Sequence, residues 1–443
     1  MKLDPRAAAT LRREFSDWKL WLTRALVMLS ASAAGLVVVA FTRLSELALS
    51  RFHALHAQWW WAPLLWTPLC CAAIVWVTRR HFVGAAGSGI PQVMAAMDTA
   101  VEPGERGLYV SLRLSLAKIV LTSWGLLAGL SLGREGPSVQ VAAGVMHAVR
   151  RWLPQRSIMT EHGLLVAGGA AGIAAAFNTP LAGVMFAIEE LSRRMEQRSS
   201  GLLIAGIVLA GLMAVSIEGN STYFGVIRVS SPDLSMLGPG LLVAIGSGVL
   251  GGLFARLLIV SLNGQSTDRC SRWRAEHPVR FAAGCGLAIA LIGVISQGST
   301  FGSGYGATRA MLNGDESASP FYVLLRFVVT WLTAWSGVPG GIFAPALAIG
   351  AALGHDVALL TAHPEGGALI ALGMAGFLAA VTRAPLTSFI IVMEMVDGHA
   401  MVLSLMACTL VSSALARTLT RPLYATLAQV QLRRLPPRPR SGD

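Results

Sequence analysis

A carboxylate in the middle of an apolar region is the first feature of this sequence that could do chemistry. Glu135 lies in Gly133-Arg134-Glu135-Gly136-Pro137, between two long apolar runs. If those runs cross a membrane, Glu135 lies at membrane depth, where a charged group is costly and usually functional. A carboxylate there can carry a proton, and it can compete with an anion for hydrogen-bond donors. The segment therefore predicts a titratable group in a polar pocket.

The glycines and the proline around Glu135 predict that the backbone breaks there, because neither residue type supports a plain continuous helix. Irregular backbone at membrane depth is tolerated only inside protein or beside a wet cavity. Residues 87–91 and 340–345 have the same character. Each break places open amides beside the start of an apolar helix, and inward-pointing helix N-termini stabilise an anion.

Ser88, within the first of these breaks, adds a hydroxyl donor. A halide needs donors only, so hydroxyl and amide groups suit it. Such a site also binds weakly enough to release the ion, whereas a full cation would hold it too tightly. An ionised Glu135 would occupy the donor cradle itself, and a protonated Glu135 would swing away.

Composition places these breaks in a helical membrane protein. Of the 443 residues, 54% are hydrophobic and only 13% are charged. A soluble protein would carry about twice that charge. Apolar runs of spanning length recur, which predicts an all-α polytopic membrane protein, whereas a β-barrel would show alternating strands. We expect spans at roughly 25–42, 62–77, 116–132, 202–216, 239–261, 281–296, 321–335 and 401–416.

The net charge of +12 comes from basic residues scattered through short loops. This distribution fits the positive-inside pattern and excludes nucleic acid as a partner. We expect both termini in the cytoplasm, together with the clusters at 193–198 and 269–280, and the loop at 217–235 outside. No CxxC pair or HExxH motif occurs, so we expect no disulfide framework, metal or cofactor. Ser88 and Ser303 lack the GxSxG context of a nucleophile elbow, which argues against an intramembrane enzyme.

Three features of the first half return in the second half in the same order, which indicates a duplicated unit. Duplicated membrane halves are typical of transporters, whose site lies between the repeats. We expect a first repeat at 25–216 and a second at 236–425, joined by a loop at 217–235 and flanked by segments 1–24 and 426–443. The pairs are Gly87-Ser88-Gly89 with Gly302-Ser303-Gly304, Pro137 with Pro345, and Pro180 and Glu189 with Pro385 and Glu394.

Four segments together resemble the CLC family of chloride channels and proton/chloride antiporters, in family order over roughly residues 30–427. They are Gly87-Ser88-Gly89-Ile90-Pro91, Gly133-Arg134-Glu135-Gly136-Pro137, Gly341-Ile342-Phe343-Ala344-Pro345 and Arg421-Pro422-Leu423-Tyr424. The resemblance implies two inverted repeats of tilted and broken helices. It also implies a homodimer with one pore per subunit. The compact size, the short loops and the lack of a regulatory tail predict a location in the lipid of a bacterial inner membrane. Only 19 residues follow Tyr424, so we expect no C-terminal regulatory domains.

The resemblance also assigns roles to residues. Ser88 and Tyr424 would donate hydroxyls to the central chloride, and the amides of Ile342 and Phe343 would complete its shell. Glu135 would be the outer gating glutamate, and Glu190 the inner proton-transfer glutamate. Glu190 favours proton-coupled antiport, while a passive voltage- or pH-gated chloride channel on the same scaffold stays open as the alternative.

Three positions depart from the family pattern. The family often has glutamate where this chain has Gln92, and many bacterial members have a second acid where it has Met94. Lys118 would then lack an acidic partner. These departures bear on the inner proton route and leave the anion site intact. For Glu189 and Glu394 we favour a structural hydrogen-bonding role.

Overall fold

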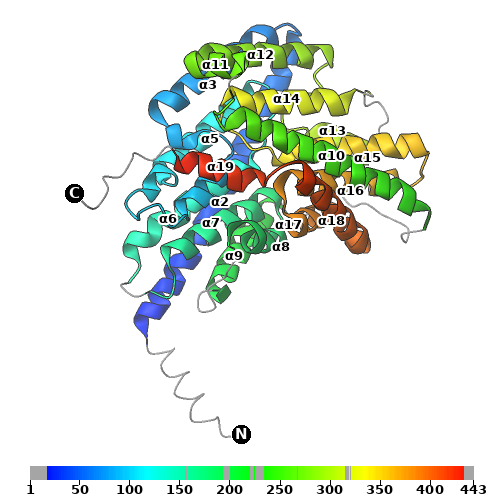
Figure 1. The fold of residues 1–443 in the computed structure, drawn as a ribbon. Coiled ribbons are helices and arrows are strands. Elements are labelled where there is room, and N and C mark those ends of the chain that lie inside the picture. Colours follow the sequence, from blue (N-terminus) through cyan, green and yellow to red (C-terminus); the bar gives the residue numbers. More distant parts are fainter. Residues whose placement is uncertain are drawn as a thin grey trace.

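The computed structural model describes residues 17–154, 157–192, 200–219, 224, 234–266, 268–314, 319 and 321–433. The basic cluster expected at 193–198 and most of the expected loop at 217–235 lie outside the described residues. Within the described part the chain is helical nearly throughout and forms no strand (Figure 1).

The helices of the two halves follow a matching order. The first half contains α2 (Trp18–Gln58), α3 (Pro63–His81), α4 (Ile90–Ala96), α5 (Leu112–Leu127), α6 (Glu135–Ala148), α7 (Glu161–Phe177), α8 (Pro180–Phe186) and α9 (Ser200–Glu218). The second half contains α10 (Leu237–Leu262), α11 (Arg269–Glu276), α12 (Pro278–Ile295), α13 (Tyr305–Leu312), α14 (Tyr322–Ser336), α15 (Phe343–Thr361), α16 (Gly366–Thr382), α17 (Pro385–Met395), α18 (Val402–Leu419) and α19 (Leu423–Leu432).

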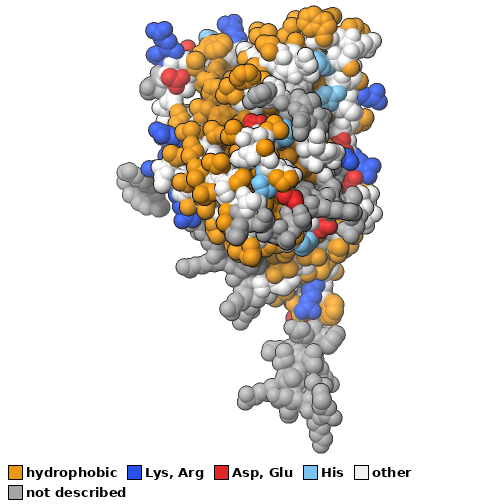
Figure 2. Space-filling view, turned by 90° about the vertical axis from the view of Figure 1, so that its right-hand side faces the viewer, with side chains coloured by type: hydrophobic (Ala, Val, Ile, Leu, Met, Phe, Trp, Pro, Cys, Tyr) orange, Lys and Arg blue, Asp and Glu red, His pale blue; other side chains and the backbone are white. Residues whose placement is uncertain are grey.

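Seven of the described helices are long and apolar enough to cross a membrane, and four more apolar helices are shorter. The sequence-based spans omitted α7, α15, α16 and α17. The apolar run at 321–335, which was expected to span, forms α14. With 15 residues, α14 is one of the shorter apolar helices. Large hydrophobic side chains lie exposed along α2, α3, α10 and α18. Hydrophobic surface also covers much of the face in Figure 2. Because such exposure would be unfavourable in water, these helices face lipid. The protein is therefore a multi-pass membrane protein.

The equivalent helices α8 and α17 lie side by side (Figure 1). Glu189, just after α8, accepts hydrogen bonds from the amides of Leu386 and Thr387 at the start of α17, at 3.1 and 2.7 Å. Glu394, at the end of α17, accepts from the amides at the start of α8, those of Leu181 and Ala182, at 3.3 and 2.8 Å.

Each glutamate thus caps the N-terminus of the equivalent helix in the other half, where unpaired amides and the helix dipole favour a carboxylate. This exchange is possible only if the two helices point in opposite directions. The halves are therefore inverted relative to each other, as the family resemblance implied. The structural role expected for Glu189 and Glu394 is confirmed.

Glycines allow the helices around the site to approach closely. A Cβ at Gly172 of α7 would overlap the backbone of Ser138 in α6, and a Cβ at Gly373 of α16 would overlap the backbone of Gly350 in α15. Small residues at helix crossings are typical of membrane proteins, where packing holds the helices together. The tightly packed pairs α6–α7 and α15–α16 fix the positions of the two helix N-termini that matter below.

Candidate functional site

The three predicted breaks exist, and they meet. Helices α4, α6 and α15 begin at Ile90, Glu135 and Phe343, immediately after their glycine-rich segments. Gly133 and Gly341 exchange two backbone hydrogen bonds, each of 2.8 Å, in an isolated antiparallel bridge. The amide of Gly340 donates to the carbonyl of Gly87 at 3.2 Å. These bonds bring the N-terminal ends of helices from both repeats to one point.

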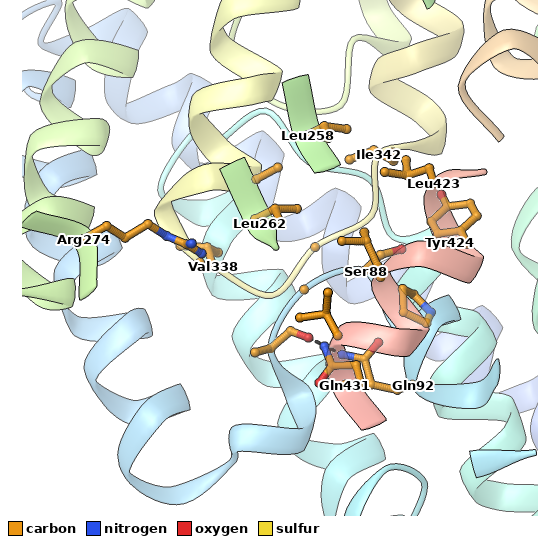
Figure 3. Close-up of a pocket in the computed structure, with 18 residues that line it drawn as sticks. Ser88, Gln92, Leu258, Leu262, Arg274, Val338, Ile342, Leu423, Tyr424 and Gln431 are labelled. Atoms are coloured by element: carbon orange, nitrogen blue, oxygen red, sulfur yellow. Dashed lines mark hydrogen bonds between the residues drawn. The ribbon is translucent and has the colours of Figure 1, made fainter. Parts of the chain in front are cut away.

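Ser88, Ile342 and Tyr424 line a cavity of about 100 Å³, called here the Ser88 cavity (Figure 3). The hydroxyls of Ser88 and Tyr424 interact with each other, but neither has a hydrogen-bond partner of regular geometry within the described chain. A buried hydroxyl without a partner is costly, so such groups usually serve a ligand. The structure therefore brings together the two hydroxyls and one of the two amide-bearing residues that the sequence predicted for the anion.

Aromatic packing positions Tyr424, which is only 1% exposed. It follows Pro422 in the first turn of α19, and its ring stacks on Phe343 with a centroid distance of 6.0 Å. Phe177 and Phe186 contact the Phe343 ring as well. Phe343 thus uses its ring to anchor the first turn of α15, whose amides have no intrahelical acceptor and are free to face an anion.

Glu135, 1% exposed, folds its carboxylate back into the space that the missing side chain of Gly133 leaves open. The same space borders the amide of Ala344 in the first turn of α15, and that amide interacts with the carboxylate. Glu135 therefore lies where an anion at the α15 N-terminus would be stabilised. Arg134 turns its guanidinium towards Glu46, at 2.8 Å.

Glu135 also lines a second cavity of about 70 Å³, called here the Glu135 cavity, with Glu46, Arg134, Ser303 and Tyr305 among its lining residues. No described residue lines both this cavity and the Ser88 cavity. Tyr424, on the Ser88 cavity, still interacts electrostatically with Glu135. The Glu135 carboxylate therefore lies on the wall of one cavity and within electrostatic reach of Tyr424 on the wall of the other.

Glu190 lies in a single π-helical turn, Ala187–Leu191, directly after α8. Its side chain is half-buried and interacts electrostatically with Tyr424. The neighbouring Glu189 points instead to the start of α17. Turns of this kind are frequent at functional sites, because the extra residue re-aims the side chains that follow. Two adjacent carboxylates therefore face different elements.

Sequence reasoning gave Lys118 no partner, but the structure supplies one. Fully buried, its Nζ donates to the carbonyls of Ala85 and Gly87 at 2.6 and 2.7 Å. In the second repeat Arg326 holds the equivalent carbonyls, those of Thr300 and Gly302. Gln92 accepts from the Gly89 amide at 3.0 Å and donates to the carbonyl of Ala86. Lys118 and Gln92 thus fix the loop that carries Ser88.

The packing of Gly133 leads to a prediction about competition at the site. A Cβ introduced by Gly133→Ala would overlap the Glu135 carboxylate, so the variant should push that carboxylate out of its place beside α15. We expect chloride affinity, measured by isothermal titration calorimetry, to rise several-fold, because the anion loses its competitor. Gly136→Ala is the matched control, since its Cβ would instead overlap the Ser88 hydroxyl, and it should weaken binding. Equal effects of the two variants would contradict the competition.

A bundle of inverted, broken helices whose N-termini converge on buried hydroxyls and one carboxylate defines a membrane protein that handles a small anion. Residues 70–417 match the voltage gated chloride channel family, and the chain belongs to that family.

Curated relatives cover most of the chain. The H(+)/Cl(-) exchange transporter ClcA of Salmonella paratyphi A is 31% identical over 414 residues, which make up 89% of this chain and 85% of the relative. The ClcA of Citrobacter koseri is 29% identical over 437 residues, covering 94% and 89%.

Solved structures share the fold. A slow cyanobacterial Cl−/H+ antiporter superposes with a TM-score of 0.78 at 25% identity, covering 93% of this chain and 98% of that one. A CLC-type fluoride/proton antiporter has the same fold, with a TM-score of 0.76 at 22% identity, covering 91% and 97%.

Proposed function

We propose that this protein exchanges chloride for protons across a bacterial inner membrane and is not an enzyme. One observation carries the proposal: the Glu135 carboxylate lies beside the Ala344 amide at the α15 N-terminus and lines the Glu135 cavity. A group in that position competes with an anion while ionised and loses its attraction once protonated. The curated relatives, named as H(+)/Cl(-) exchange transporters, support the same substrates.

In the proposed cycle, chloride occupies the Ser88 cavity. The hydroxyls of Ser88 and Tyr424 and the amides of Ile342 and Phe343 donate to it. Arg274, whose guanidinium donates to the carbonyl of Ser261 at 3.1 Å, also lines this cavity. Protonation of Glu135 releases the carboxylate from α15 and opens the way past it. When the proton leaves, the carboxylate returns and displaces the ion. Glu190 carries protons on the side of the Ser88 cavity.

Simultaneous recording of chloride and proton fluxes from reconstituted liposomes tests this proposal. Chloride efflux should drive proton movement in the opposite direction, against a proton gradient. Chloride movement with no proton movement would favour the passive channel on the same scaffold.

We propose that the protein is a homodimer in lipid, as the family resemblance implies. Both cavities are enclosed by elements of a single chain, which supports a separate pore in each subunit. Both termini and α11 would lie in the cytoplasm, in keeping with the arginines of α11.

Cys270 provides a test of this orientation. It lies on α11 and is exposed, whereas Cys70, Cys71, Cys285 and Cys408 are buried. A membrane-impermeant maleimide should label the protein in inverted membrane vesicles and leave it unlabelled in intact spheroplasts, with Cys270→Ser as the control for background. Labelling in spheroplasts would reverse the assigned orientation.

A further inference from the structure

The Glu135 cavity contains a second carboxylate, that of Glu46 on α2. This side chain is 58% exposed and accepts a hydrogen bond from Arg134 at 2.8 Å. Arg134 is itself buried and also donates to the carbonyl of Thr42 at 3.2 Å. Glu46 is therefore a solvent-accessible acid held at a fixed place, on the wall of the cavity that leads to the buried Glu135.

We infer that Glu46 relays protons between the outer solution and Glu135. This inference rests on the proposed antiport and extends it to the outer half of the proton route. A buried carboxylate exchanges protons efficiently only with a group in hydrogen-bond reach, directly or through water. The Glu135 cavity, which both carboxyl groups line, has a volume of about 70 Å³ and therefore room for a few water molecules.

The position of Glu46 along α2 agrees with an outward-facing relay. Helix α2 has 41 residues and is much longer than the roughly 30 Å hydrocarbon core requires. With its start in the cytoplasm, its last third lies on the outer side, followed by Trp59-Trp60-Trp61, a sequence typical of a membrane interface. The proton passes from the Glu46 carboxyl to the Glu135 carboxylate through water, and Glu46 then recovers a proton from the outer solution.

Glu46 faces charged groups on its own helix and on the other walls of the cavity. Arg43, one turn earlier on α2, interacts with it electrostatically and pairs mainly with Glu218 of α9, at 2.7 Å. The other walls of the cavity carry Arg134, which directly precedes α6, and Glu135, the first residue of α6. Tyr305 lines the cavity from α13, and the apolar Leu126 lines it from α5. Arg134 keeps its charge beside Glu135 and favours the ionised form there. Glu135 can therefore give up a proton that it has received.

The test compares Glu46→Gln with Glu218→Gln in liposomes that have the same pH on both sides. Glu218 of α9 is the matched control. It is an acid paired with Arg43, which lies on α2 like Glu46, but it does not line the cavity. We expect Glu46→Gln to slow coupled exchange at neutral pH on the order of tenfold. The deficit should shrink towards about pH 4.5, where protons from bulk water reach Glu135 directly. Glu46→Asp, which keeps a titratable group, should recover part of the rate.

A second background separates a relay from a structural role. Glu135→Gln removes the group that the relay serves, so adding Glu46→Gln should leave the remaining chloride flux unchanged. A further loss there would mean that Glu46 acts through the packing of Arg134, and it would overturn the inference. So would a wild-type exchange rate in Glu46→Gln, or an equal deficit in Glu218→Gln. If the wild-type protein moves chloride without protons, the proposed antiport fails instead.

Discussion

Glu135→Gln is expected to abolish proton coupling while chloride continues to cross the membrane. Glutamine has nearly the same shape as glutamate but carries no exchangeable carboxyl proton and no negative charge. It can therefore neither transport a proton nor compete strongly for the amides at the start of α15, beside which Glu135 folds. The proposed chloride donors, which are Ser88, Tyr424 and the first-turn amides of α15, stay in place.

The measurement is paired recording of chloride and proton fluxes from liposomes, with wild-type protein as the reference. Proton movement should fall to the leak of protein-free liposomes, a loss of at least about 100-fold for a group that carries the proton itself. Vesicles of the variant that still pump protons on a chloride gradient would show that the gate is another residue.

The second large effect is expected from two adjacent carboxylates that should behave differently. Glu190→Gln should reduce proton transport about tenfold or more, because it removes a titratable group beside Tyr424 on the side of the Ser88 cavity. Chloride binding, measured by calorimetry, should stay at its wild-type value, because Glu190 donates nothing to the anion.

Glu189→Gln is the matched control for this experiment. Its carboxylate caps α17, so the change should cost about 1 kcal/mol of stability and lower the thermal unfolding temperature in detergent, with proton transport retained. Two results would contradict these assignments. One is a Glu190 variant that is unstable but still fully coupled, and the other is a Glu189 variant that loses coupling.

Several parts of the fold could be predicted from sequence because they depend on composition and on local backbone chemistry. Hydropathy places most of the chain in the membrane. The helix breaks before Ile90, Glu135 and Phe343 follow from glycine and proline alone. The sequence-based spans missed α7, α15, α16 and α17, whose residues are largely buried. Of these, α17 has only 11 residues, whereas the 19-residue α15 is long enough to cross a membrane.

The site could be predicted only as a set of candidates. Glu135 was identifiable because a carboxylate in an apolar region is unusual, and the duplicated motifs indicated that both halves contribute. Which breaks touch is a matter of packing over long separations, as in the bridge between Gly133 and Gly341. No local pattern encodes such a contact.

By itself, then, the sequence determined a duplicated helical membrane protein with interrupted helices and an isolated carboxylate, because periodicity, glycine and proline act over a few residues. Only the tertiary structure decided that Glu189 and Glu394 cap each other's repeats, that Lys118 holds the Ser88 loop, and that Glu46 shares a cavity with Glu135. Each of these contacts joins residues on different elements, and unpaired polar groups within a membrane must find whatever partner the packing brings near.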